Sequence, residues 1–176
     1  MRAAKAYTVN GHIIAFMPTW KEVTAANPAH SHNFARKWKT LRAQGKDIDG
    51  EARLIDAMVE RNSRVLDAGC GTGRLGGELA KRGHTVAGVE VDPILIEHPE
   101  HDYPEARWEV GDLSEDEIPE GDFDIAVAAG NVMTFIAPEG REAALRNIFD
   151  ALRPGGRFVV GFGEGRGLSL IHISEP

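Results

Sequence analysis

The sequence predicts an α/β fold of three layers, in which a mainly parallel β-sheet lies between two layers of helices. Short apolar runs that end at a glycine or an acidic residue alternate with longer segments whose apolar residues recur every three to four positions. A glycine-rich turn, GCGTG, directly follows the first of these runs. Strands that alternate with helices in this way pair in parallel through right-handed crossovers, which cover both faces of the sheet.

Five strands are expected, at residues 64–67, 84–90, 106–110, 123–128 and 157–162. The helices between them are expected at residues 75–82, at 93–99 and at 138–152. Asp92 should cap the second of these helices and Pro99 should end it. The run Pro154-Gly155-Gly156 should separate the last helix from the fifth strand.

Two more helices are expected before the first strand. One covers residues 33–44, with Phe34, Trp38 and Leu41 on one face. The other follows Asp49, and its apolar face consists of Leu54, Ile55, Met58 and Val59. Residues 1–16 show no clear element, and Met17 is an alternative start of the protein. We therefore expect an N-terminal extension with a helical lid at residues 1–46 and an α/β domain at residues 47–167.

The composition is that of one globular domain. The chain has 176 residues, of which 42% are apolar and 27% are charged, as is usual for a domain with its own core. The single cysteine, Cys70, cannot form an internal disulfide. No apolar run reaches the roughly 20 residues needed to span a membrane, and no signal-peptide pattern is present. These features predict a cytoplasmic protein with no membrane partner.

The net charge of −7 is unevenly distributed along the chain. Residues 1–46 hold eight Lys or Arg and one acid, whereas the remaining residues hold twelve Lys or Arg and 26 acids. A basic arm on an acidic body is compatible with an anionic substrate or with nucleic acid. Because the arm has no dense basic cluster, we favour its docking on its own acidic body, and nucleic acid is disfavoured as a partner.

The glycines at positions 69, 71 and 73 are typical of a cofactor-binding turn. They permit positive φ and let a ligand approach bare backbone, while the following helix offers free N–H groups. Together with Gly76, the spacing also matches the dinucleotide pattern, in which Glu90 would hold a ribose. The turn alone therefore leaves a nicotinamide-dependent oxidoreductase as an alternative.

Three further features favour a different cofactor. Asp67, at the end of the first strand, would put a carboxylate beside the cofactor, which suits an ammonium or sulfonium group better than a pyrophosphate. The sequence Gly111-Asp112-Leu113 ends the third strand and offers a carboxylate to an adenine amino group. The sequence LRPGG at residues 152–156 directly precedes the fifth strand.

With these features, residues 50–165 resemble the class I S-adenosylmethionine-dependent methyltransferases. VLDAGCGTGR matches the first motif of that family, and GDL and LRPGGRFVV match later motifs in the same order and spacing. The resemblance implies a Rossmann-like fold, S-adenosyl-L-methionine as the cofactor and methyl transfer as the activity. The segments NPAHSHNFARKW and GNVMTF are most similar to small uncharacterised bacterial methyltransferases, so the resemblance does not indicate the acceptor.

The resemblance also implies which residues bind the cofactor. Asp67 and the backbone of residues 69–73 would hold the methionine moiety, Glu90 both ribose hydroxyls, and Asp112 with Leu113 the adenine. Gly130 and Asn131, after the fourth strand, would lie beside the transferred methyl group. The full expected set is Asp67, Ala68, Gly69, Cys70, Gly71, Gly73, Glu90, Val91, Asp112, Leu113, Gly130 and Asn131.

The catalytic residues do not follow from the sequence. The cofactor is already activated, so the protein mainly positions a nucleophile and excludes water, and some nitrogen or oxygen nucleophiles need a general base. The candidates are His30 and His32 in the N-terminal lid, together with Asn131; for the two histidines, an ordinary loop position is the alternative. No metal site is expected, because neither this histidine pair nor His98 and His101 has a third ligand at a suitable spacing.

The C-terminal end departs from the family pattern. The family's sheet has seven strands, and the last two form an antiparallel pair beyond the fifth. Residues 168–176 (LSLIHISEP) have the composition of a short strand, but SLIHISEP resembles translated sequencing-adaptor sequence. We therefore expect a C-terminally truncated chain that lacks the last two strands and carries an artefactual tail.

These observations predict a methyltransferase that acts on a small-molecule acceptor by in-line displacement. A nicotinamide-dependent oxidoreductase is disfavoured by Asp67. A non-catalytic cofactor-binding module is the other alternative, because the expected truncation affects the activity of this chain. The acceptor, the atom that is methylated and the oligomeric state do not follow from the sequence.

Overall fold

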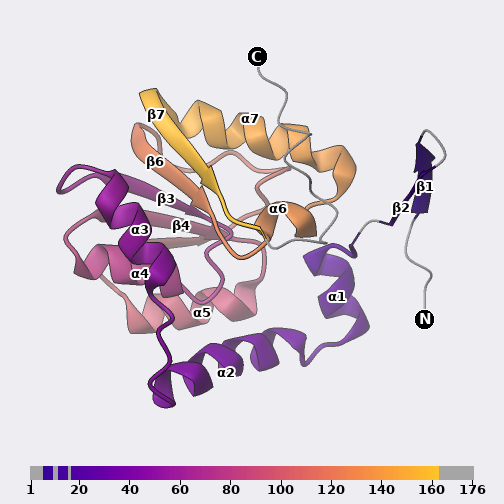
Figure 1. Ribbon diagram of the computed structural model, residues 1–176, viewed down its shortest axis with the longest axis horizontal. Coiled ribbons are helices and arrows are strands. Elements are labelled where there is room, and N and C mark those ends of the chain that lie inside the picture. Colours follow the sequence, from indigo (N-terminus) through magenta and orange to yellow (C-terminus); the bar gives the residue numbers. More distant parts are fainter. Residues whose placement is uncertain (1–5, 10–11, 16, 163–176) are drawn as a thin grey trace.

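A five-stranded parallel sheet forms the centre of the protein (Figure 1). The computed structural model describes residues 6–9, 12–15 and 17–162. The strands, in the order β5-β4-β3-β6-β7 across the sheet, are β3 (Arg64–Ala68), β4 (Thr85–Glu90), β5 (Arg107–Val110), β6 (Phe123–Ala128) and β7 (Leu152–Val160). The chain first extends the sheet from β3 toward β5 and then returns to the other side of β3. Parallel α/β sheets bind ligands at such a reversal, beyond the carboxyl ends of the strands.

Helices cover both faces of this sheet. On one face, α3 (Gly50–Met58), α4 (Arg74–Lys81) and α5 (Pro93–Asp102) contribute Ile55, Leu79 and Ile96 to a buried core. On the other face, α6 (Val132–Phe135) and α7 (Arg141–Ala151) contribute Met133 and Ile148. The three-layer α/β fold and all five predicted strands are therefore confirmed.

The N-terminal region contains elements that the sequence did not predict. β1 (Ala6–Val9) and β2 (His12–Ala15) form an antiparallel hairpin, so the expectation of no element before Met17 is wrong. The helix α1 (Trp20–Ala26) begins at a capping box, in which Glu22 N donates to Thr19 Oγ1 at 3.2 Å and Thr19 N donates to Glu22 Oε2 at 2.9 Å. The predicted helix at residues 33–44 is α2 (His30–Ala43), which begins one turn earlier.

The prediction that Pro99 ends α5 is wrong, because the helix continues to Asp102. The proline ring is buried under the glycine turn, where a Cβ added to Gly73 would lie 2.4 Å from Pro99 Cβ. The turn beyond it closes, since Tyr103 N donates to Pro99 O at 2.8 Å. Burial of the ring thus offsets the hydrogen bond that a proline inside a helix cannot make.

The segment around Pro154-Gly155-Gly156 also differs from the prediction, because this run lies inside β7 rather than before it. Phe123 pairs with Leu152 whereas Ile125 pairs with Arg157, so a bulge takes up the additional residues of β7. The predicted helix at 138–152 is divided into a 3₁₀ turn, η1 (Pro138–Gly140), and α7.

Leu54 was expected on the apolar face of α3, but it is 58% exposed, because the buried face of this short helix is formed by Ala52 and Ile55. The expected tail at residues 168–176 lies outside the described residues. Within the described ranges, no helix combines the length and the apolar character that crossing a membrane requires.

Candidate functional site

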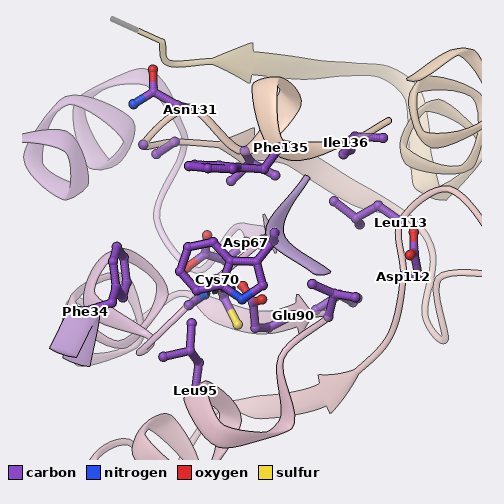
Figure 2. A pocket seen from close by; sticks show the side chains of 18 of the residues that line it. Phe34, Asp67, Cys70, Glu90, Leu95, Asp112, Leu113, Asn131, Phe135 and Ile136 are labelled. Carbon is purple, nitrogen blue, oxygen red and sulfur yellow. Dashed lines mark hydrogen bonds between the residues drawn. The ribbon is translucent and has the colours of Figure 1, made fainter. Parts of the chain in front are cut away.

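A cavity of about 580 Å³ lies at the carboxyl ends of the central strands. Figure 2 shows Phe34 of α2 at one end of it, with Asp112 and Leu113 at the other end. Phe135 and Ile136 lie across the cavity from Leu95. The volume is within the range of small-molecule and cofactor sites, which is about 300–1,000 Å³.

The glycine turn after β3 presents bare backbone to the cavity. Gly69 N and Cys70 N both donate to Val89 O, at 2.8 and 3.1 Å, which ties the turn to β4. Gly69 has a φ of 78°, and a Cβ added to it would lie 2.5 Å from a γ-methyl group of Val132. Only glycine satisfies both the left-handed backbone and this close contact.

Asp67 is a buried carboxylate at the end of β3. It is 2% exposed, and its Oδ2 accepts a hydrogen bond from Gly76 N in α4 at 2.8 Å. Burial raises the pKa of Asp67 to about 6, against the lowering effect of the Gly76 hydrogen bond. The carboxylate therefore supplies a fixed and poorly solvated acceptor on the wall of the cavity.

Glu90 is a second buried carboxylate, at the end of β4. Its Oε2 accepts from Gly71 N at 2.9 Å, and its Oε1 accepts from Asp92 N at 3.0 Å. Burial raises the pKa of Glu90 to about 7, and the two backbone hydrogen bonds lower it by less. Among the residues that the structure places, no cation pairs with this group. A ligand that donates hydroxyl groups to an ionised carboxylate therefore fits here.

Asp112, after β5, is already engaged by its surroundings. Lys21 Nζ of α1 lies 2.5 Å from Asp112 Oδ2, and Ser114 donates to Oδ1 through its N at 2.9 Å and its Oγ at 2.6 Å. Burial acts to raise the pKa of Asp112, but the hydrogen bonds from Lys21 and Ser114 outweigh it and leave that pKa below its usual value. The carboxylate is thus ionised and held in one position.

An aromatic cluster closes the cavity on the side of α1 and α2, which we call the lid helices. The ring of Trp20 makes edge contacts with His30, Phe34 and Phe135, at centroid distances of 5.1, 5.4 and 5.5 Å. All four side chains line the cavity. Because they come from α1, α2 and α6, the cluster joins the lid helices to the α/β body.

Most of the cofactor-binding residues expected from the sequence lie at this cavity. It is lined by Asp67, Gly69, Cys70, Gly71, Glu90, Val91, Asp112, Leu113, Gly130 and Asn131. Ala68 and Gly73 do not line it. Ala68 is fully buried in the core, and Gly73 precedes α4 and packs against Pro99.

The two candidate histidines have different positions. His30 lines the cavity, whereas His32 is exposed on α2 outside it. Asn131 also lines the cavity, at the N-terminus of α6. In the described part of the chain, no group of three or more His, Cys, Asp or Glu side chains is placed to hold a metal ion.

The residues through which the lid helices reach the site were not predicted from the sequence. Trp20 and Lys21 of α1 line the cavity, and Asp92, expected only as a helix cap, also contacts both lid helices. The capping box at Thr19 and Glu22 is the signal that would have indicated α1 and its first residue, Trp20.

The family follows from this geometry together with a match in sequence. Residues 65–156 match the family model described as a methyltransferase domain, and this range contains β3 from its second residue, the glycine turn, Glu90 and Asp112. The chain belongs to the class I S-adenosylmethionine-dependent methyltransferases.

Individual relatives agree with this class. The chain is 60% identical to a TehB-like S-adenosylmethionine-dependent methyltransferase from Corynebacterium glutamicum, with a TM-score of 0.79 over 82% of this chain and 79% of that one. It is 26% identical to an amino pentose methyltransferase from Micromonospora echinaspora, solved with S-adenosylmethionine bound, with a TM-score of 0.61 over 70% of this chain and 54% of that one.

Among curated proteins, a magnesium-protoporphyrin O-methyltransferase from Rhodobacter capsulatus is 37% identical over 93 residues, which is 50% of this chain and 40% of that protein. The chain spans between 40% and 54% of the length of the first four curated relatives that it matches.

Proposed function

We propose that this chain transfers a methyl group from S-adenosylmethionine to a small-molecule acceptor. The observation that carries the proposal is the cavity itself, in which the two buried carboxylates of Asp67 and Glu90 lie beside the bare backbone of the glycine turn. A nucleoside with a ribose diol and a cationic amino acid end matches this distribution of acceptors.

The residues of the cavity support one orientation of the cofactor. Glu90 would accept hydrogen bonds from the ribose hydroxyls, and Asp67 would lie toward the methionine end. Asp112 and Leu113, at the far end of the cavity from Phe34, would lie at the adenine (Figure 2). Glu90 is held by Gly71 N and Asp92 N, and in its ionised form it would accept more strongly from the two ribose hydroxyls than a neutral group does.

The chain's own contribution to the reaction is position and exclusion of water. The bound cofactor supplies a methyl group on sulfonium sulfur, which is already activated for transfer. Gly130 and Asn131, which follow β6, line the cavity, and the rings of Trp20, Phe34 and Phe135 form an apolar part of its wall. An acceptor held there is kept near the methyl group and away from bulk water.

The size of the cavity, about 580 Å³, is that of a small-molecule site. Among the relatives whose names state an acceptor, two are named for an amino pentose and for magnesium protoporphyrin, and others are named for ribosomal protein L11. Part of the basic charge of the N-terminal region also pairs with this chain's own acids, since Lys21 lies against Asp112 and Arg42 against Asp49. We therefore favour a small acceptor over nucleic acid, and the cytoplasm remains the predicted location.

His30 is the candidate base for an acceptor that must lose a proton, because it lines the cavity and His32 does not. We expect His30→Asn to lower kcat and to leave the affinity for S-adenosylhomocysteine unchanged. His32→Asn, on the exposed face of the same helix, is the matched control and should behave as wild type. Equal turnover in the two variants would remove His30 from the mechanism.

The cofactor class is tested by isothermal titration with S-adenosylhomocysteine and, separately, with NADH. We expect saturable binding of the first and none of the second, and binding of NADH alone would refute the proposal. Methyl transfer is then measured as formation of S-adenosylhomocysteine from S-adenosylmethionine over a panel of small hydroxyl, amine and thiol acceptors. Tight binding without turnover on any acceptor would favour a non-catalytic cofactor-binding module.

A further inference from the structure

One carboxylate ties both lid helices to the α/β body. Asp92 follows β4 directly and is 6% exposed. Trp20 Nε1 of α1 donates to Asp92 Oδ2 at 2.8 Å, and Ser31 Oγ of α2 donates to the same oxygen at 2.5 Å. The other oxygen, Oδ1, accepts from Ile94 N at 3.0 Å and so caps α5. One carboxylate oxygen of Asp92 thus binds the lid helices, and the other binds the N-terminus of α5 in the α/β body.

This lid contact lies next to the expected ribose site. Asp92 N donates to Glu90 Oε1, while Gly71 N donates to Glu90 Oε2. Glu90 therefore contacts the glycine turn through one oxygen and the residue that holds the lid helices through the other. Any change in the position of Asp92 occurs within one hydrogen bond of the cofactor site.

A second and weaker tie reaches the other end of the cavity. Lys21, the neighbour of Trp20, pairs with Asp112 and lies 3.5 Å from Glu115. Its side chain is 56% exposed, and exposed ion pairs contribute little to stability. Hydrogen bonds to a buried charged group contribute more, so the contact at Asp92 is the stronger of the two.

We propose that Asp92 is a positioning residue that keeps α1 and α2 closed over the cavity, and that release of its Oδ2 from Trp20 and Ser31 gates the entry and exit of the nucleoside cofactor. The inference rests on the proposed function, because it takes the cavity to be the cofactor site. Trp20, Lys21 and Phe34 form part of the cavity wall, so a movement of α1 and α2 away from the body would widen the path of a nucleoside into the cavity.

The main test is Asp92→Asn, assayed by the association and dissociation rates of S-adenosylhomocysteine. Asparagine caps a helix as well as aspartate does, so the contact of Oδ1 with Ile94 N is retained. The new amide nitrogen in place of Oδ2 cannot accept from Trp20 or Ser31. Because hydrogen bonds to a charged group are lost, we expect both rates to rise by about 10- to 100-fold, while the equilibrium constant changes much less.

Two partial variants and one control sharpen the test. Ser31→Ala removes one donor and leaves that of Trp20, and Trp20→Phe removes the indole N–H but keeps an aromatic ring. Each should raise both rates by less than Asp92→Asn does. Thr24→Ala is the control on α1, since among the described residues the Thr24 hydroxyl bonds only to backbone oxygens of its own helix, and its rates should equal those of wild type.

The joint rise of the two rates distinguishes a gate from an ordinary binding contact. If Asp92→Asn raises only the dissociation rate, Asp92 belongs to the binding surface and the inference is wrong. It is equally wrong if a folded Asp92→Asn protein, verified by circular dichroism, has the rates of wild type. Failure of the wild-type protein to bind S-adenosylhomocysteine would instead refute the proposed function.

Discussion

Replacing Glu90 by glutamine should lower the affinity for S-adenosylhomocysteine by about 100-fold. The carboxylate loses its charge, and one of its two oxygens becomes an amide nitrogen that cannot accept from a ribose hydroxyl. Hydrogen bonds to charged groups contribute roughly 1.5–3 kcal/mol each, so loss of one or two of them gives a change of this size. Isothermal titration at pH 8 measures the effect. Glu105→Gln, at an exposed position outside the cavity, is the matched control.

The same residue should make the stability of the ligand-free protein depend on pH. The pKa of Glu90 is raised from 4.5 to about 7 in the folded state, so its neutral form favours folding. The stabilisation is fully present below pH 4.5 and is lost as the pH rises through about 7, by about 3 kcal/mol in total. Asp67 acts in the same direction over a lower range, up to about pH 6.

Urea unfolding of the ligand-free protein between pH 5 and pH 8 tests this dependence. Wild type should lose stability as the pH rises, and Glu90→Gln should show a smaller loss because the contribution of Glu90 is absent. Parallel slopes for the two proteins would mean that Glu90 is not the source of the pH dependence.

In the isothermal titration, an affinity of Glu90→Gln for S-adenosylhomocysteine equal to that of wild type would contradict the assignment of Glu90 to the ribose.

The second large effect is expected for Gly69→Ala. The substitution places a side chain on a backbone with a φ of 78° and brings its Cβ within 2.5 Å of Val132. A left-handed conformation costs a non-glycine residue roughly 1–2 kcal/mol, and overpacking typically costs about 1–3 kcal/mol more. The free energy of unfolding in urea should therefore fall by about 2–5 kcal/mol.

Gly45→Ala separates the two causes of this loss. Gly45 has a φ of 69°, and a Cβ there would meet nothing within 4 Å, so only the backbone strain of roughly 1–2 kcal/mol is expected. Adding Val132→Ala to Gly69→Ala should recover part of the loss, because it removes the methyl groups that clash. An equal loss in Gly45→Ala and Gly69→Ala would show that the contact with Val132 has no effect.

The sheet was predictable because each of its strands is a local signal. Residues such as Val65, Leu66 and Ile125 form short apolar runs in the sequence and lie in the buried core. The errors occurred where packing overrides local preference. Pro99 stays inside a helix because its ring is buried against Gly73, and Pro154 stays inside a strand because a bulge accommodates it.

Part of the site was likewise predictable from the sequence, and part of it was not. Asp67, Glu90 and Asp112 each end or follow a strand of one parallel sheet, so their convergence follows once the strands are known. The contacts of Trp20 and Ser31 with Asp92 have no such basis, because they join residues 72 and 61 positions apart in the chain. The docking of the lid helices depends on tertiary packing alone.

The long distance in sequence between the lid helices and their partners affects the protein during its synthesis. Trp20 and Phe34 leave the ribosome well before Asp92, Asp112 and Phe135, which hold or cover the lid helices in the folded protein. At translation rates of about 5–20 residues per second, Trp20 is made roughly 4–14 s before Asp92. During that interval Trp20 lacks Asp92 and Phe135, which are its partners in the α/β body. Chaperone contact with the nascent chain is therefore expected at this amino-terminal segment first.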